Sequence, residues 1–211
     1  MINSKKHIIF DWNGTLINDA QIFVNILNVL LDKRKLNKID LVMYRDLFCF
    51  PIIDFYKKLG LDVSRDAFTQ LKKEFVGEYD KRKYCASLFP NTINMLQRLS
   101  DNNFNLSILS ASYQKTLDDL TKHYSIDRFF QHIIGVNNYI ANGKAQKGIK
   151  LINTLALKKQ DLVLIGDTNL DYSVSKFLGI DCILISHGHQ STKQLEACNN
   201  TIIQSFDVLF E

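Results

Sequence analysis

The stretch HIIFDWNGTL occupies residues 7–16 and joins a strand-like apolar run to a polar turn. The run is short and stops abruptly at Asp11, as buried parallel strands do. Gly14 follows three residues later, and a glycine at this point permits a tight backbone turn. Backbone amides in such a turn can face an anion. The stretch therefore predicts a buried strand that ends in a carboxylate beside an anion-binding turn.

Short apolar runs of the same kind recur along the chain and predict further strands. The six strands that we expect are His7–Phe10, Asn105–Leu109, His132–Ile134, Leu162–Ile165, Asp181–Ile185 and Thr201–Ile203. Amphipathic stretches with helical spacing lie between most of them, namely Asn91–Ser100, Tyr113–His123, Gln146–Leu157 and Tyr172–Leu178. Strands and helices in alternation predict an α/β fold with a doubly wound, Rossmann-like parallel sheet.

One long stretch interrupts this alternation with helical patterns and no convincing strand. It runs from about residue 18 to residue 83, and its helical patterns are Gln21–Leu31, Asp54–Leu59 and Ala67–Tyr79. We interpret residues 18–83 as an inserted helical cap domain. The core α/β domain then comprises residues 1–17 and 84–211.

Polar residues also follow two other predicted strands. Ser110 and Ala111 come after one strand, and they offer a hydroxyl and backbone amides that can hold a phosphate oxygen. Asp167 and Asp171 come after another. In a doubly wound sheet the carboxyl ends of the strands meet at one crevice, so these carboxylates are expected near Asp11. Because crowded carboxylates repel each other, the arrangement predicts a hard divalent cation such as Mg²⁺.

Lys144 is the cation that we expect to balance these charges. It lies between two predicted elements, on a loop before the helix that leads to the strand ending at Gly166. Its ammonium can offset the charge of a nucleophilic carboxylate and of a phosphate. Lys147 and Lys150 are alternatives, but they fall within the amphipathic pattern of that helix and are expected to be solvated.

Four motifs in this order resemble those of the haloacid dehalogenase superfamily: DWNGT at 11–15, a strand ending before Ser110, then Lys144, then GDTNLD at 166–171. The resemblance spans the sheet domain from end to end, and the helical insertion lies where that superfamily carries its cap. A weaker likeness, to a phosphoglycolate-phosphatase-like branch, comes from three further segments, FCFP at 48–51, FYKKLG at 55–60 and GHQS at 188–191.

The resemblance implies a phosphatase in which Asp11 attacks phosphorus and forms an aspartyl-phosphate that water then hydrolyses. It also implies an Mg²⁺ site formed by Asp11, the backbone carbonyl of Asn13, Asp167 and Asp171. The phosphoryl oxygens would be held by Ser110, the amides near Ala111, and Lys144. Further candidate substrate contacts are Thr15, Arg45 and Phe50.

Position 13 departs from the pattern of that superfamily. Its phosphatases normally carry aspartate two residues after the nucleophile, where it serves as general acid and base, whereas this chain has Asn13. General acid–base catalysis is typically worth about 10²- to 10⁴-fold in rate. The enzyme is then slow, or its substrate has a good leaving group such as an acyl phosphate, or the fold is a non-catalytic phosphate-binding module. On the first interpretation, the Asn13→Asp replacement should raise turnover.

A second alternative function is that of a haloacid dehalogenase, which attacks carbon without a metal. The presence of both Asp167 and Asp171 argues against this function.

The net charge of +4 is too small for the concentrated basic surface of a nucleic-acid binder. The four cysteines are scattered, with no CxxC pair, and the N-terminal residues lack the pattern of a signal peptide. We therefore expect a cytoplasmic enzyme, a monomer or small homo-oligomer, that binds a small phosphorylated metabolite, with no nucleic-acid or membrane partner.

Overall fold

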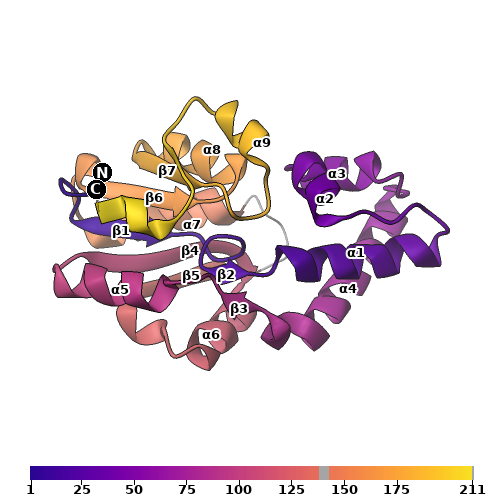
Figure 1. The fold of residues 1–211 in the computed structure, drawn as a ribbon, viewed down its shortest axis with the longest axis horizontal. Helices are drawn as coiled ribbons and strands as arrows, with labels where there is room; N and C mark the ends of the chain where they lie inside the picture. Colours follow the sequence, from indigo (N-terminus) through magenta and orange to yellow (C-terminus); the bar gives the residue numbers. More distant parts are fainter. Residues whose placement is uncertain (138–142, 211) are drawn as a thin grey trace.

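The structure is a computed structural model that describes residues 1–137 and 143–210. Its centre is a six-stranded sheet in the order β5-β4-β1-β6-β7-β8, and each neighbouring pair is parallel (Figure 1). The strands are β1 (His7–Phe10), β4 (Asn105–Tyr113), β5 (His132–Val136), β6 (Leu162–Gly166), β7 (Asp181–Ile185) and β8 (Ile202–Ile203). The predicted doubly wound parallel sheet is confirmed.

Helices cover both faces of this sheet. They are α5 (Thr92–Asp101), α6 (Gln114–His123), α7 (Gly143–Leu155), α8 (Asn169–Leu178) and the short α9 (Thr192–Glu196). Successive side chains of a strand point to opposite faces. Ile8 and Phe10 of β1 accordingly pack in one apolar cluster with residues of α5 and α6, while Ile9 packs in another with residues of α7 and α8. Burial on both faces makes β1 a rigid support for the residues that follow it.

Four helices lie together at one end of the molecule, within the segment predicted to be a cap, and are called the cap helices below. These cap helices are α1 (Ala20–Lys33), α2 (Leu41–Leu47), α3 (Ile52–Lys58) and α4 (Arg65–Arg82). They enclose an apolar cluster of their own, with Leu27, Tyr44 and Phe55 among its buried members. Both chain termini lie at the opposite end of the molecule (Figure 1). The division at residues 18 and 83 stays a prediction, but the helices of that segment do share a separate core.

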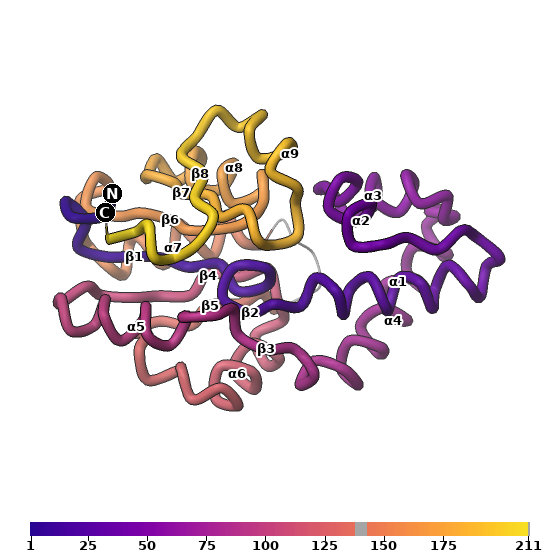
Figure 2. The backbone as a smooth tube through the Cα atoms, in the orientation of Figure 1, coloured from indigo at the N-terminus to yellow at the C-terminus, as the bar shows by residue number. Residues whose placement is uncertain are grey.

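The chain passes between the sheet and the cap helices twice, at one small antiparallel pair of strands (Figure 2). β2 (Ile17–Asn18) leads into α1, and β3 (Ser87–Leu88) returns after α4. Ile17 pairs with Leu88 and Asn18 with Ser87. Two residues per strand are too few to produce a readable sequence pattern, so this pair was not predicted.

The helix α2 was also missed, because its sequence lacks an amphipathic pattern: Val42 and Met43 are exposed, and Tyr44 is buried. Its start is fixed locally, since the Asp40 carboxylate accepts a hydrogen bond from the Met43 amide at 2.7 Å, as an N-cap residue does. Among the helices of the described residues, none has the length and apolar character needed to cross a membrane.

Candidate active site

Three buried carboxylates meet at the carboxyl ends of β1 and β6. Asp11, Asp167 and Asp171 each offer an oxygen within 4.8 Å of the oxygens of the other two. The sheet register explains the meeting, because Phe10 pairs with Ile165 and the residues that follow each strand leave the sheet side by side. Asp171 reaches the same point from the first turn of α8. The predicted cluster is therefore present, and its oxygen ligands fit a hard divalent cation.

Glycines make room for these carboxylates. Gly14 has φ +73°, in the left-handed region, and a Cβ there would collide with the carboxylate of Asp167. A Cβ at Gly188 would collide with the same carboxylate, and one at Gly166 would collide with Asp171. The turn after β1 and the loop after β7 therefore both approach the site with bare backbone.

Hydrogen bonds fix the two aspartates that follow β6. Asp167 accepts from the Thr15 hydroxyl at 2.9 Å and from the His189 backbone amide at 2.7 Å. Asp171 accepts from the Thr168 hydroxyl at 2.7 Å and from the Thr168 amide at 3.0 Å. The bond from the Thr168 amide is one half of a capping box at the start of α8, in which the Thr168 side chain accepts from the backbone amide of Asp171 in return. The same carboxylate that faces the cluster therefore also caps the helix.

Lys144 is buried beside these carboxylates. Its Nζ lies 2.8 Å from Oδ1 of Asp11 and 2.5 Å from Oδ1 of Asp171. The predicted loop position was wrong, because Lys144 belongs to the first turn of α7, which begins at Gly143. The helix directs the ammonium into the cluster, whereas Lys150 on the same helix is exposed.

Burial perturbs the charges of the cluster. It raises the pKa of Asp11 to about 6, against the opposing effect of Lys144 and with a further increase from Asp171. Burial also raises the pKa of Asp167 to about 7, although the nearby His189 lowers it. The pKa of Lys144 is raised because its two carboxylate partners outweigh the cost of burying its charge. Unscreened carboxylates therefore destabilise the folded state at neutral pH, and a bound cation would relieve that cost.

We expect Asp167 to make the metal-free protein less stable as the pH rises from 6.5 to 8. An ordinary Asp in the unfolded chain has already lost its proton, while folded Asp167 retains its proton up to about pH 7. At this group the folded state thus binds more protons across the range, and its stability falls as they are released. His189, whose pKa is raised, contributes with the same sign. Thermal unfolding in a chelating buffer should show Tm of the wild type falling by about 2 °C more than that of Asp167→Asn.

Two histidines oppose this trend. Burial lowers the pKa of both His7 and His187 to about 4, so their contributions to stability grow as the pH rises from about 4, and about half of such histidines in the unfolded chain still carry a proton at pH 6.5. Their effect is complete only near pH 7.5, so the Asp167→Asn variant, which keeps both histidines, is the comparison that isolates Asp167. A change in Tm from pH 6.5 to 8 that is equal in the wild type and in Asp167→Asn would contradict the assigned state of Asp167.

The side chain of Asn13 faces the cap helices. Its amide nitrogen donates to Oδ2 of Asp19 at 2.5 Å and to the Tyr79 hydroxyl at 3.1 Å, and its oxygen accepts from the Ser112 hydroxyl. These contacts concern the side chain alone. The role of its backbone carbonyl as a metal ligand stays a prediction.

The other predicted contacts lie in different settings. Ser110 is buried in β4, where the pairing with β5 shifts register between Leu109 and Tyr113, and its hydroxyl accepts from the Ser112 amide at 3.0 Å. The Thr15 hydroxyl is occupied by Asp167. Ala111 is half-buried in β4, next to Ser110.

The two cap candidates are held by other groups. Arg45 donates from Nε to the Gly188 carbonyl at 2.8 Å and from its guanidinium to the His187 carbonyl at 2.7 Å, so it fastens α2 to the loop after β7. Phe50 packs against Phe48 in the cap cluster. Their roles as substrate contacts stay predictions.

Sequence reasoning missed Asp19 and assigned no role to His189. Both are buried, and Nε2 of His189 lies 3.1 Å from Oδ1 of Asp19. Within the described ranges the metal-ligand group consists of the three aspartates, so His187 and His189 are outside it. The GHQS segment at 188–191 was the available signal, but a lone histidine between polar residues does not reveal its partner.

Known proteins resemble this chain in sequence and in fold. A profile of the family described as haloacid dehalogenase-like hydrolase matches residues 8–185. The chain is 21% identical to pyrophosphatase PpaX of Halalkalibacterium halodurans over 183 aligned residues. These residues cover 85% of this chain and 83% of that protein. It is 23% identical to a phosphoglycolate phosphatase of Mesorhizobium japonicum, over 98% of this chain and 93% of the relative.

Solved structures agree on the fold. A haloacid dehalogenase-like hydrolase of Streptococcus pneumoniae superposes with a TM-score of 0.84 at 24% identity, covering 98% of this chain and 97% of the other. A predicted phosphatase of Clostridium acetobutylicum superposes with a TM-score of 0.82 at 19% identity, covering 97% of this chain and 96% of the other. The family profile spans most of the sheet and all four cap helices. Of the four motifs, DWNGT and GDTNLD lie at the ends of β1 and β6, whereas Ser110 lies within β4, which runs past the predicted end at Leu109, and Lys144 lies in the first turn of α7. The chain belongs to the haloacid dehalogenase-like hydrolase family.

Proposed function

We propose that this protein is an Mg²⁺-dependent phosphatase that hydrolyses a small phosphorylated metabolite through a covalent intermediate on Asp11. One observation supports the proposal above all others: Asp11, Asp167 and Asp171 converge with Lys144 in a buried cluster at the strand ends. Such a cluster combines a nucleophile, a cation site and a fixed positive charge. Phosphoryl transfer requires mainly positioning and neutralisation of charge, which these groups can supply.

In the proposed first step, a carboxylate oxygen of Asp11 attacks phosphorus while the bond to the leaving oxygen breaks. The leaving oxygen takes up a proton from water, and the phosphoryl group remains on Asp11 as an acyl phosphate. A second water then attacks that phosphorus, the bond to the Asp11 oxygen breaks, and inorganic phosphate leaves. The proton that the attacking water gives up to solvent replaces the one taken in the first step. The nucleophile is regenerated with its original charge, so atoms and charges balance over the cycle.

The neighbouring residues prepare Asp11 for this attack. Lys144 neutralises part of the negative charge and, at 2.8 Å, orients one Asp11 oxygen. Asp167 and Asp171, held by Thr15 and Thr168, would bind Mg²⁺ together with Asp11. Bound Mg²⁺ would supply charge neutralisation for the phosphoryl oxygens. Ser110 and the amides near Ala111 would hold those oxygens on the side of β4.

The relatives suggest the class of substrate. They are named for action on pyrophosphate and on phosphoglycolate, and another, from Pseudomonas aeruginosa, is named 5'-nucleotidase. These compounds are phosphate esters or anhydrides that differ in the leaving group. We infer that the cap, residues 18–83, selects the leaving group and shields the reaction from water by its movement over the rigid site.

A panel of phosphorylated metabolites, assayed for phosphate release with Mg²⁺ and with a chelator, tests the proposal. We expect turnover on at least one ester or anhydride with Mg²⁺, and a loss of about 100-fold or more after chelation, restored by added Mg²⁺. The Asp167→Asn variant should lose activity to a similar degree, because one of the three carboxylate ligands loses its charge.

Two results would contradict the proposal. Turnover that persists in the chelator would point to a reaction that needs no metal, as in the dehalogenase alternative. Absence of phosphate release from every compound, together with no Mg²⁺-dependent adduct of beryllium fluoride on the protein, would favour the non-catalytic module that Asn13 allows.

A further inference from the structure

A buried carboxylate that the proposed mechanism does not use lies at the junction of the sheet domain and the cap. Asp19 has 0% exposure and accepts four hydrogen bonds. The donors are the Asn13 amide at 2.5 Å, the Gly14 backbone amide at 3.2 Å, the Tyr79 hydroxyl at 3.1 Å and the His189 ring at 3.1 Å. Asp19 therefore connects the turn after β1, the helix α4 and the loop after β7.

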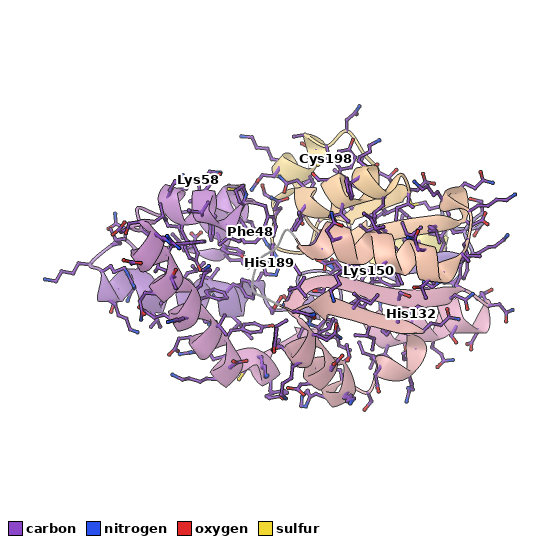
Figure 3. All side chains as sticks on the ribbon, turned by 180° about the vertical axis from the view of Figure 1, so that it is seen from behind. Phe48, Lys58, His132, Lys150, His189 and Cys198 are labelled. Atoms are coloured by element: carbon purple, nitrogen blue, oxygen red, sulfur yellow. The ribbon has the colours of Figure 1, made fainter. Side chains whose placement is uncertain are left out.

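The same junction continues into α2. Nδ1 of His189 lies 2.7 Å from the Tyr44 hydroxyl, and its ring packs on Phe23 and Phe48. Phe48 and His189 lie where the cap helices meet the sheet domain (Figure 3). His189, one of the four donors to Asp19, is thus itself fixed by contacts with cap residues.

The Asn13 side chain complements the Asp19 carboxylate, because it is neutral and donates a hydrogen bond that the carboxylate accepts. Both hydrogens of its amide are engaged, by Asp19 and by the Tyr79 hydroxyl, and its oxygen accepts from Ser112. A carboxylate at position 13 would instead face the buried Asp19 carboxylate at hydrogen-bonding distance. Two like charges this close, one of them fully buried, repel each other.

We propose that Asp19 is the positioning residue for position 13: it holds the Asn13 amide in place and requires an amide there. We therefore expect Asn13→Asp to raise turnover only in a chain in which residue 19 is neutral, because a carboxylate at position 13 is otherwise repelled by Asp19. The exchanged pair, Asn13→Asp with Asp19→Asn, restores one carboxylate and one amide at the same contact. The kinetic part of this inference rests on the proposed phosphatase function, whereas the pairing itself does not.

A double-mutant cycle tests the pairing. Thermal unfolding of the wild type, Asn13→Asp, Asp19→Asn and the double variant is compared in chelating buffer. Loss of a charged, buried hydrogen bond should lower Tm by about 5 °C in each single variant. The double variant should recover at least about half of the summed loss. Asn18→Asp, the same change at an exposed neighbouring position, is the control and should leave Tm unchanged.

Turnover of the same variants with Mg²⁺ gives the second readout. Asn13→Asp alone should gain less than about threefold in kcat, while the double variant should exceed that single variant by about tenfold or more, with KM changed little. A structural role for Asp19 alone would not produce a higher kcat in the double variant than in either single variant.

The two failures are distinguishable. If the wild type and all variants release no phosphate, the proposed function is wrong, and the unfolding cycle still decides the pairing. If the effects on Tm add, if the double variant folds no better than the single ones, or if Asn13→Asp alone is as fast as the double variant, the role given to Asp19 is wrong. The role given to Asp19 is supported only if the changes in Tm are not additive and the double variant has a higher kcat than either single variant.

Discussion

The Asp11→Asn variant is expected to lose turnover by about 10⁴-fold or more while keeping its fold. An amide has the shape of the carboxylate but is a far weaker nucleophile and cannot form the acyl phosphate on which the proposed mechanism depends. The measurement is phosphate release with Mg²⁺ on the best substrate of the wild type. Trapping of a labelled phosphoryl group on the wild type but not on the variant provides an independent check.

Stability should change in the opposite direction to activity. Because burial raises the pKa of Asp11 to about 6, its ionised form at pH 7.5 destabilises the folded state relative to the unfolded one. Replacement by a neutral amide removes that cost, and Lys144 keeps its contact with Asp171 at 2.5 Å. We expect Tm in chelating buffer to stay equal or rise.

A fall in Tm that accompanies the loss of activity would indicate that Asp11 is a structural residue. Residual turnover within tenfold of the wild type would rule out Asp11 as the nucleophile. Asp101→Asn, at an exposed position of α5, is the control for the chemical change itself and should alter neither quantity.

The carboxylate cluster could be predicted because its causes are local. A strand pattern that stops at Asp11 and another that stops at Gly166 place the following residues, and parallel topology brings those strand ends to one edge. Lys144 was identified as well, but its place in the first turn of α7 was not, because the amphipathic pattern that predicted this helix starts only at Gln146.

The junction could not be predicted, because its contacts depend on how the cap helices lie against the sheet domain. Asp19 precedes α1 and resembles an ordinary helix-capping residue in sequence. In the described structure its carboxylate instead accepts from Tyr79 and His189, 60 and 170 residues away. A sequence pattern with a period of two or of about four residues contains no information about contacts at such separations.

The Lys144→Met variant should lose both stability and activity. Lys144 has 1% exposure and is the ammonium that contacts both Asp11 and Asp171, so its removal leaves buried carboxylates without that partner. Breaking a buried pair by removing one partner typically costs about 3–5 kcal/mol. For a protein of this size that corresponds to a fall in Tm of about 10 °C in chelating buffer at pH 7.5.

Lys150→Met is the matched control, because it makes the same change at an exposed position of the same helix (Figure 3). Its Tm and turnover should equal those of the wild type. A second comparison isolates the charge. Because burial raises the pKa of Asp11 to about 6, lowering the pH to 5.5 protonates it and should reduce the Tm deficit of Lys144→Met relative to the wild type.

The outcome distinguishes electrostatic balance from packing. If Lys144 acts through its charge, the deficit shrinks at low pH and in the Lys144→Met, Asp171→Asn double variant, where one uncompensated carboxylate has been removed. If Lys144 acts mainly by filling space, methionine replaces most of its volume and the deficit is small at every pH. A deficit that is large and independent of pH would contradict both accounts and would show that the carboxylates are balanced by another group.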